Sequence, residues 1–354
     1  MYHSKDITQL HIEISTLCQA ECAMCGRNDR GGLENPKLIN KNMSLETFKQ
    51  LFPVEFLKQI KVINLCGNYG DPIMNRELKE ITKYITINAI YGELHVHTNG
   101  GAKTALWWHE YIEALAPQHT IHFALDGLAD THNLYRTKID YYTVLENASA
   151  FINAGGNARW VFLKFKHNEH QVDAARTIAK ELGFTSFQVK ETARFIATDN
   201  FPVLDNNGCV THTLEQSTEH KITFIDRKTV ENYKEILSTV TIDCAVKKTK
   251  DLYIDVHGDV FPCCYVGAIP YSYTRLEAPG YPYSVENLAQ YTALELGSFN
   301  GKITPINELI DSDKWQNTYS SILKDKTLLT CSKVCGKKVS STSDQFTVLD
   351  SFIQ

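Results

Sequence analysis

Short runs of alternating apolar and polar residues recur along the first 200 residues, and most are followed by a longer segment with helical periodicity. The runs that predict strands are 10–15, 61–67, 93–100, 120–127, 158–166 and 186–195. The segments that predict helices are 44–60, 76–88, 105–115, 141–154 and 172–182. Strands that alternate with helices indicate βαβ units and a parallel sheet. The pattern therefore predicts an α/β fold built on six parallel strands.

The pattern changes near residue 200. Residues 201–240 are polar and largely irregular, and we interpret this stretch as a linker. Two β-like runs within 251–264 flank the dipeptide His257-Gly258, which indicates a hairpin. The remaining features are a tyrosine-rich loop over 265–283 and a helix near 305–323. We therefore expect an α/β part over 1–200, the linker, and a small α+β domain over 241–354.

Composition places the chain among ordinary globular proteins. Of its 354 residues, 43% are hydrophobic and 22% are charged, with a formal net charge of −5. This balance gives no basic footprint, so we expect no nucleic-acid partner. No stretch approaches the roughly 20 apolar residues of a membrane helix, and the N-terminal sequence lacks the pattern of a signal peptide. We therefore expect a cytoplasmic protein, in which clustered cysteines indicate metal binding or catalysis.

The cysteines form two groups at opposite ends of the sequence. The ten positions are Cys18, Cys22, Cys25, Cys66, Cys209, Cys244, Cys263, Cys264, Cys331 and Cys335. The first three belong to the run Cys18-Gln-Ala-Glu-Cys22-Ala-Met-Cys25, directly after the first predicted strand. Three thiolates of one loop can bind three irons of a cubane cluster and leave the fourth iron open. Structural zinc normally takes four ligands, so this spacing favours a [4Fe–4S] cluster over zinc.

This C-x3-C-x2-C run resembles the signature of the radical S-adenosylmethionine superfamily. The resemblance implies a partial (β/α)6 TIM-like barrel with a [4Fe–4S] cluster at Cys18, Cys22 and Cys25. It also implies that S-adenosylmethionine binds the open iron and is cleaved, by one-electron reduction, to methionine and a 5′-deoxyadenosyl radical. In the family this radical abstracts hydrogen from a substrate. The electron would come from a reductase or a flavodoxin-type donor.

Motifs after further strands extend the resemblance. Tyr69-Gly70-Asp71 stands where the family has a Gly-Gly-Glu-Pro motif that binds the amino group of the methionine moiety. Thr98-Asn99-Gly100 resembles a Thr-Asn-Gly element near the methionine and the ribose. The resemblance thus implies cofactor binding by Tyr69, Gly70, Asp71, Thr98 and Asn99, with Asn168, after the fifth strand, reaching the ribose.

Two further residues at strand ends are candidates for catalytic roles. Asp126 lies in Ala-Leu-Asp-Gly (124–127), which resembles the Ser-Ile-Asp-Gly of the subgroup with extra clusters, with alanine in place of serine. Asp126 could equally cap the following turn. Cys66 ends the second strand, at the strand end where parallel barrels place their chemistry, although small strand residues are usually just packed.

The second cysteine group resembles the SPASM/twitch extension of the same superfamily. Cys244, Cys263, Cys331 and Cys335 would bind one auxiliary [4Fe–4S] cluster, as in the shorter twitch form. The final pair is spaced C-x3-C, wider than the family's usual pair, and Cys264 could therefore replace one of the four. On spacing alone a structural zinc site is an alternative, and the upstream cluster motif favours iron and sulfide.

His95, His97 and His122 also lie on predicted strands. Alternation puts His95 and His97 on one face, yet no spacing typical of metal ligands recurs among the three. We interpret them as side chains of the barrel rather than as a metal site.

Several functions fit these features. The first hypothesis is an enzyme that modifies a peptide or protein, although no leader-recognition domain fits before the first strand. The second is radical dehydrogenation of a small molecule, with the auxiliary cluster accepting the second electron. A radical epimerase would use a cysteine as hydrogen donor, for which Cys66, Cys209 and Cys264 are candidates. The alternative from another class is a non-catalytic iron–sulfur or zinc protein that binds a partner.

Overall fold

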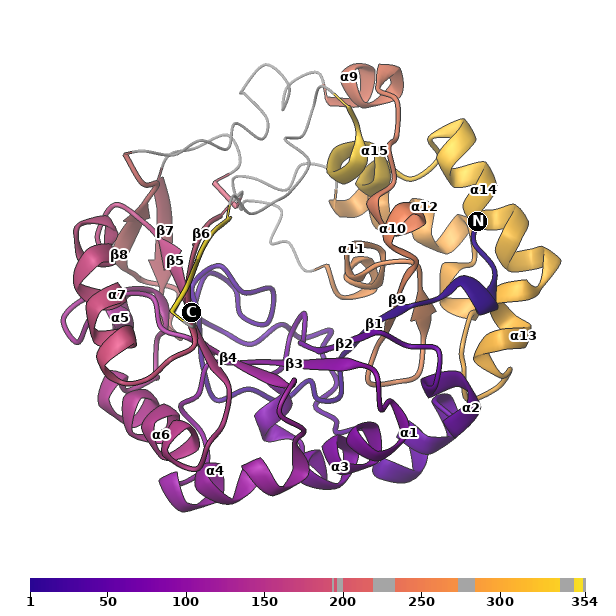
Figure 1. Ribbon diagram of the computed structural model, residues 1–354. Helices are drawn as coiled ribbons and strands as arrows, with labels where there is room; N and C mark the ends of the chain where they lie inside the picture. The colour runs from indigo at the N-terminus through magenta and orange to yellow at the C-terminus, as the bar shows by residue number, and fades with distance from the viewer. Residues whose placement is uncertain (193, 196–199, 219–232, 273–283, 338–346, 353–354) are drawn as a thin grey trace.

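The computed structural model describes residues 1–192, 194–195, 200–218, 233–272, 284–337 and 347–352 (Figure 1). Its main sheet has nine strands in the order β10-β9-β1-β2-β3-β4-β5-β6-β11. The six predicted strands are β1 Gln9–Ile12, β2 Val62–Leu65, β3 Glu93–Thr98, β4 Thr120–Ala124, β5 Ala158–Lys164 and β6 Ser186–Glu191. All five pairings among them are parallel, and the sheet curves into an open barrel. The predicted α/β class and partial barrel are confirmed.

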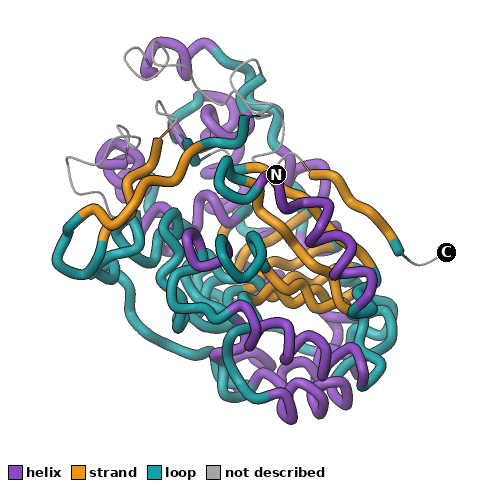
Figure 2. Tube along the Cα trace, turned by 90° about the vertical axis from the view of Figure 1, so that its left-hand side faces the viewer, coloured by secondary structure: helices purple, strands orange, loops and turns teal. Residues whose placement is uncertain are grey.

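Helices cover the convex face of this sheet (Figure 1). They are α1 Leu45–Leu51, α2 Val54–Leu57, α3 Leu78–Asn88, α4 Ala105–Tyr111, α5 His132–Tyr135, α6 Tyr141–Asn153 and α7 Val172–Glu181. Short 3-10 helices are Ser4–Asp6, Pro72–Met74, Ile112–Ala114, Glu169–Gln171, Ile269–Tyr271 and Leu296–Ser298. The single helix predicted over 44–60 is wrong: Pro53 separates α1 from α2, because proline clashes with the preceding turn of a helix. Strands lie side by side within the molecule, with helices packed outside them (Figure 2).

The C-terminal part continues the same sheet. Strand β9 (Asp251–Ile254) pairs in parallel with β1, and β10 (Val260–Phe261) pairs antiparallel with β9. Gly258 in their turn has a φ of +87°, which glycine adopts without a steric penalty. The predicted hairpin is therefore confirmed. At the other edge, β11 (Thr347–Ser351) pairs antiparallel with β6.

Helices of the C-terminal part pack beside β9. They are α9 Tyr233–Thr239, α10 Ala245–Thr249, α11 Cys264–Gly267, α12 Ser284–Ala293, α13 Ile306–Asp311, α14 Asp313–Asp325 and α15 Leu329–Cys335. The helix predicted near 305–323 is two helices, since the Ser312 hydroxyl accepts a hydrogen bond from the Trp315 backbone N–H and begins α14. Of the tyrosine-rich loop predicted over 265–283, the first part is helical and 273–283 lie outside the described residues.

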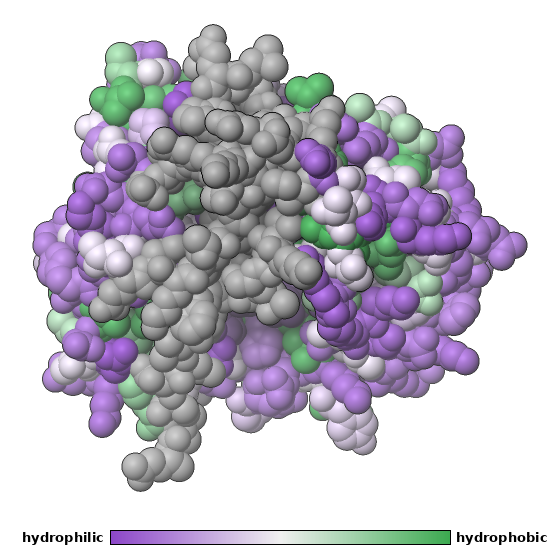
Figure 3. Space-filling view, turned by 90° about the horizontal axis from the view of Figure 1, so that it is seen from above, coloured by the Kyte–Doolittle hydropathy of each residue, from purple (hydrophilic) through white to green (hydrophobic). Residues whose placement is uncertain are grey.

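Part of the predicted linker is not irregular. Strands β7 (Asn200–Leu204) and β8 (Val210–Glu215) form an antiparallel hairpin, and residues 219–232 lie outside the described part. Asn207-Gly208, a strong turn signal, was the available clue. The division at 201–240 stays a prediction. Within the described residues no helix has the length and apolar character to cross a bilayer. Seen from above, the described residues around the rim are mostly hydrophilic (Figure 3).

Candidate active site and auxiliary cavity

The loop after β1 carries Cys18, Cys22 and Cys25, and each sulfur accepts at least one N–H contact. The Asn99 Nδ2 group lies 3.5 Å from the Cys18 Sγ atom. The Arg136 Nη1 group lies 3.7 Å from the Cys22 Sγ atom, and the Arg27 backbone nitrogen lies 3.5 Å from the Cys25 Sγ atom. Donors of this kind stabilise thiolates and tune a bound cluster. The three cysteines therefore already have the surroundings that cluster ligands need.

Burial makes these thiols poor thiolates without a cation. It raises the pKa of Cys18, and the nearby Asp71 carboxylate raises it further. Burial raises the pKa of Cys22 to about 11, although the Arg136 guanidinium opposes the shift. Iron would supply the positive charge that the ligands lack, because a coordinated thiol is deprotonated outright.

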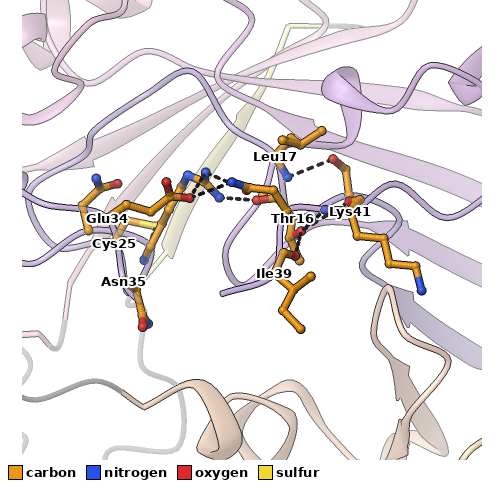
Figure 4. A network of polar contacts seen from close by, with 12 residues as sticks. Thr16, Leu17, Cys25, Glu34, Asn35, Ile39 and Lys41 are labelled. Atoms are coloured by element: carbon orange, nitrogen blue, oxygen red, sulfur yellow. Dashed lines mark hydrogen bonds and ion pairs between the residues drawn. The ribbon is translucent and has the colours of Figure 1, made fainter. Parts of the chain in front are cut away.

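A network of polar contacts fixes the loop shape (Figure 4). The guanidinium of the buried Arg27 donates hydrogen bonds to the Thr16 carbonyl and to Glu34 Oε1, and an N–O distance of 3.0 Å joins it to Asn40 Oδ1. The Thr16 hydroxyl donates to the Ile39 carbonyl at 2.7 Å and accepts from the Lys41 backbone N–H at 2.8 Å. These side-chain contacts to neighbouring backbone and side-chain groups hold the cysteine loop in its conformation.

Glu13, which the sequence reasoning missed, joins β1 to the loop after β2. Its Oε1 atom accepts from the backbone N–H groups of Tyr69 at 2.8 Å and Gly70 at 3.0 Å. Its Oε2 atom accepts from the Tyr253 hydroxyl at 2.7 Å. A Cβ at Gly70 would lie 1.9 Å from the Ser15 carbonyl oxygen, so only glycine fits there. A glutamate within the run 10–15, which the sequence predicts as a strand, was the available signal.

Asp71 links the β2 and β3 ends. Its Oδ2 atom accepts from the Asn99 backbone N–H at 2.8 Å and from the Thr98 hydroxyl at 3.0 Å. Burial raises the pKa of Asp71, and these donors oppose the shift. The Asn99 side chain also accepts from Gln19 at 2.8 Å, besides contacting Cys18. The structure thus brings Tyr69, Gly70, Asp71, Thr98 and Asn99 together beside the cysteine loop.

Asp126 is fully buried and reaches the cysteine loop through Arg136. Its Oδ2 atom lies 2.6 Å from Arg136 Nε, and its Oδ1 atom accepts from the Leu163 backbone N–H at 2.7 Å. The same Arg136 contacts Cys22, so the carboxylate orients the cation that faces a cluster ligand. These contacts favour a positioning role for Asp126, and the predicted catalytic role is not tested by them. Arg136 itself was missed, because no motif of the sequence marks it.

Asn168 and Cys66 follow the ends of two strands, Asn168 after β5 and Cys66 directly after β2. The fully buried Asn168 amide donates to the carbonyls of Asp126 at 3.1 Å and Leu163 at 3.0 Å, and accepts from the Phe165 N–H at 2.7 Å. This side chain is therefore engaged with backbone, and its predicted ribose contact stays a prediction. Burial raises the pKa of the Cys66 thiol to about 11, which keeps it protonated at neutral pH. A protonated thiol is the form that can donate hydrogen.

The C-terminal cysteines surround one cavity of about 430 Å³. Cys244 precedes α10, Cys263 and Cys264 follow β10, and Cys331 and Cys335 belong to α15. The last two lie four residues apart on one helix face, which explains why C-x3-C can replace a closer pair. The Cys244 thiol donates a hydrogen bond to Cys335 and lowers its pKa, while Cys263 lies within electrostatic reach of Cys244 and Cys331. The residues present therefore fit a cluster.

Among the described residues, no three His, Cys, Asp or Glu side chains converge on a point that could hold one metal ion. A structural zinc site at the C-terminal cysteines stays an alternative to an iron–sulfur cluster. His95 Nδ1 lies 3.1 Å from His122 Nε2, and His97 stacks on His122 at a centroid distance of 4.1 Å, so the three histidines contact one another within the barrel.

Comparisons with known proteins agree with this site. The model of the Radical SAM superfamily matches residues 12–178, and none of the curated proteins matches the chain. A structure of anSMEcpe with bound AdoMet is 14% identical with a TM-score of 0.54, covering 96% of this chain and 88% of that chain. Streptococcus suis SuiB bound to its precursor peptide SuiA is 12% identical with a TM-score of 0.54, covering 93% and 71%. A complex of anSMEcpe with AdoMet and Cp18Cys peptide is 13% identical, with a TM-score of 0.52 and coverages of 96% and 92%.

Fold and cysteine loop together define an enzyme that uses S-adenosylmethionine and a [4Fe–4S] cluster. Residues 12–178 match the Radical SAM superfamily, which supports a radical S-adenosylmethionine enzyme. The fold similarity to anSMEcpe and SuiB covers 96% and 93% of this chain and so extends over its C-terminal part.

Proposed function

We propose that this radical S-adenosylmethionine enzyme abstracts hydrogen from a peptide or protein substrate. The observation that carries the proposal is the set of N–H contacts to Cys18, Cys22 and Cys25, continuous with the buried Asp71–Thr98–Asn99 network. A binding scaffold would not need such a cofactor cradle. The peptide is favoured because SuiB and anSMEcpe, which share the fold, were each solved with a peptide bound.

The residues of this chain would divide the work as follows. Cys18, Cys22 and Cys25 hold the cluster, and Tyr69, Gly70, Asp71, Thr98 and Asn99 border the space for the methionine moiety. Asn168 braces the strand ends where the ribose would lie. When cluster and cofactor are bound, one electron splits S-adenosylmethionine into methionine and a 5′-deoxyadenosyl radical, which takes a hydrogen atom from the substrate.

Cys244, Cys263, Cys331 and Cys335 would hold an auxiliary [4Fe–4S] cluster in the C-terminal cavity. A cluster held there would supply a one-electron acceptor, so that a substrate radical losing one electron and one proton would become an oxidised product. The electron would leave through the donor chain, a reductase or a flavodoxin-type protein. Electrons balance, since one enters for cofactor cleavage and one leaves with substrate oxidation. Four thiolate ligands leave no open iron, which suits electron transfer rather than substrate binding.

A second candidate is epimerisation with Cys66 as the hydrogen donor. The Cys66 thiol lies at the end of β2, and its raised pKa keeps the S–H bond intact. An epimerase needs reduction of the resulting thiyl radical by the external donor. Replacement of Cys66 by alanine separates the two candidates, because an oxidation would continue and an epimerisation would stop.

Anaerobically reconstituted protein tests the main proposal. We expect about eight irons per chain, and 5′-deoxyadenosine upon addition of dithionite and S-adenosylmethionine. Cys22→Ala should abolish its formation, whereas Cys209→Ala, on the exposed turn between β7 and β8, serves as the matched cysteine control. Wild-type protein that takes up zinc in place of iron and forms no 5′-deoxyadenosine would refute the proposal.

A further inference from the structure

The concave face of the barrel is polar, and packing of the convex face establishes which side chains point inward. On β6, the Phe187 ring contacts Trp160 at a centroid distance of 6.0 Å, and the Arg176 guanidinium of α7 lies 5.5 Å from the same ring. Phe187 therefore faces the helices. Because side chains alternate along a strand, Gln188 and Lys190 face the barrel interior.

Lys190 is a largely buried cation that has no charged partner among the described residues. In the part of the chain that the structure describes, its ammonium group makes no hydrogen bond and no ion pair. The contrast is Lys164 on the neighbouring strand, whose Nζ atom lies 3.2 Å from Glu191 Oε1. A buried charge that lacks a partner is costly, so an incoming ligand of opposite charge would be stabilised beside Lys190. Burial accordingly lowers the pKa of Lys190.

None of the described charged groups that share the interior with Lys190 forms an ion pair with it. Arg159, one strand away, donates from Nε to the Ser186 hydroxyl at 2.8 Å and lies within electrostatic reach of Lys190. The carboxylate that acts electrostatically on Lys190 is that of Asp126, which is already paired with Arg136 at 2.6 Å. Asp71 and Glu13 accept hydrogen bonds from neutral donors. Among the described residues Lys190 therefore has no ion-pair partner, and an incoming anionic ligand could supply one.

We propose that Lys190 binds a carboxylate of the substrate, such as an acidic side chain or a chain terminus of a peptide, and orients it beneath the cofactor site. This inference rests on the proposed function. The methionine carboxylate of S-adenosylmethionine offers the same chemistry. We assign the site to the substrate because the cofactor-binding residues lie at the ends of β1 to β5, whereas Lys190 lies on β6, next to the edge strand β11 (Figure 1).

The test uses trifluoroacetate as a probe, with neutral trifluoroacetamide as its matched comparison. Its ¹⁹F line width is titrated on reconstituted, oxidised protein that is saturated with S-adenosylmethionine, at constant ionic strength. Wild type and Lys180→Met, which removes an exposed lysine of α7, should broaden the trifluoroacetate signal saturably. Lys190→Met should bind it at least about tenfold more weakly, as expected for loss of one charge-assisted hydrogen bond. Trifluoroacetamide should show no saturable binding.

Three results would overturn the assignment. Equal trifluoroacetate binding by Lys190→Met would show that the anion lies elsewhere, and equal binding of trifluoroacetamide would show that charge plays no part. A rise of about tenfold or more in the dissociation constant of S-adenosylmethionine in Lys190→Met would assign the lysine to the cofactor carboxylate. All these measurements omit reductant. Their outcome therefore does not depend on whether the protein forms 5′-deoxyadenosine.

Discussion

At the scale of single residues, the cysteine loop is governed by a few buried polar contacts. The carboxylate of Asp126, the guanidinium of Arg136 and the thiol of Cys22 form one chain of contacts from β4 to the loop. The position of the Asp126 side chain is fixed, because it is fully buried and also accepts a hydrogen bond from the Leu163 N–H. Its contacts in turn fix the side chains of the other two. Removal of one member should therefore disturb the other two.

Arg136→Met should reduce the free energy of unfolding of the metal-free protein by about 3–5 kcal/mol, because it leaves the Asp126 carboxylate buried without its counter-charge. The double variant Asp126→Asn/Arg136→Met should recover most of this loss. Urea unfolding measures both. Lys138→Met, which breaks the exposed pair of Lys138 with Glu21, is the control and should cost below about 1 kcal/mol. An Arg136→Met cost as small as that of the control would contradict the role of the buried pair.

Arg136→Lys should make the reduction potential of the first cluster more negative. Lysine keeps the positive charge yet cannot present the same fork to Asp126 and Cys22, and N–H donors to sulfur favour the reduced cluster. Redox titration followed by electron paramagnetic resonance checks this shift. An unchanged potential, with unchanged iron content, would show that the contact between Arg136 and Cys22 does not act on the cluster.

At the scale of elements, β9 joins the two cysteine centres, since it pairs with β1 and carries Tyr253. The Tyr253 hydroxyl donates to Glu13, which in turn holds the backbone of Tyr69 and Gly70. The Asn68 amide donates to both the Tyr253 hydroxyl and the Cys264 carbonyl. A strand of the C-terminal part therefore supports the cofactor loop of the barrel.

Tyr253→Phe should weaken the binding of S-adenosylmethionine and cost about 1–2 kcal/mol of stability, because Glu13 loses a buried donor. Iron content should stay unchanged, since no cysteine is moved. Equilibrium binding to the reconstituted protein and iron analysis check the two parts. Tyr142→Phe, on an exposed side chain of α6, provides the comparison. Cofactor affinity equal in both variants would contradict the support that β9 gives to the loop.

The β9–β10 hairpin also predicts a pH dependence. Burial, reinforced by Asp259, raises the pKa of Asp255 to about 7, well above the ordinary value for aspartate. At pH values between the ordinary pKa of aspartate and about 7, the folded state binds more protons than the unfolded state. The free energy of unfolding therefore falls as pH rises towards 7. Asp255→Asn should remove this part of the decline in metal-free protein unfolded by urea at successive pH values. A wild type and a variant with parallel profiles would refute the assignment.

The strand and helix pattern of the barrel could be predicted from sequence because alternation along β1, β2, β3, β5 and β6 reflects burial on the helix side. The hairpin β7–β8 was missed, although Asn207-Gly208 marks its turn. Cys18, Cys22 and Cys25 are marked by local spacing. Glu13 and Arg136 act through contacts with residues distant in sequence, which no local pattern records. The cysteine ligands of the site could therefore be predicted from the sequence, whereas the residues that support them, such as Glu13 and Arg136, could not.

At the scale of the whole molecule, one continuous sheet carries two cysteine centres with separate ligand sets. The first depends on a loop after β1, and the second on β10, α10 and α15. The two sets share no residue, so each should fill on its own. Substitution of a cysteine of the first centre should therefore abolish cofactor cleavage. Substitution of a cysteine of the second centre should abolish product formation while cofactor cleavage continues.

Cys331→Ala should remove about half of the iron while 5′-deoxyadenosine still forms, because Cys18, Cys22 and Cys25 are untouched. Cys264→Ala is the matched control in the same cavity. It should keep the full iron content if Cys244, Cys263, Cys331 and Cys335 are the ligands. Iron analysis and chromatography of the cleavage product decide both points. If Cys264→Ala loses the iron that Cys331→Ala retains, Cys264 is the ligand and Cys331 is not, since both thiols face one cavity.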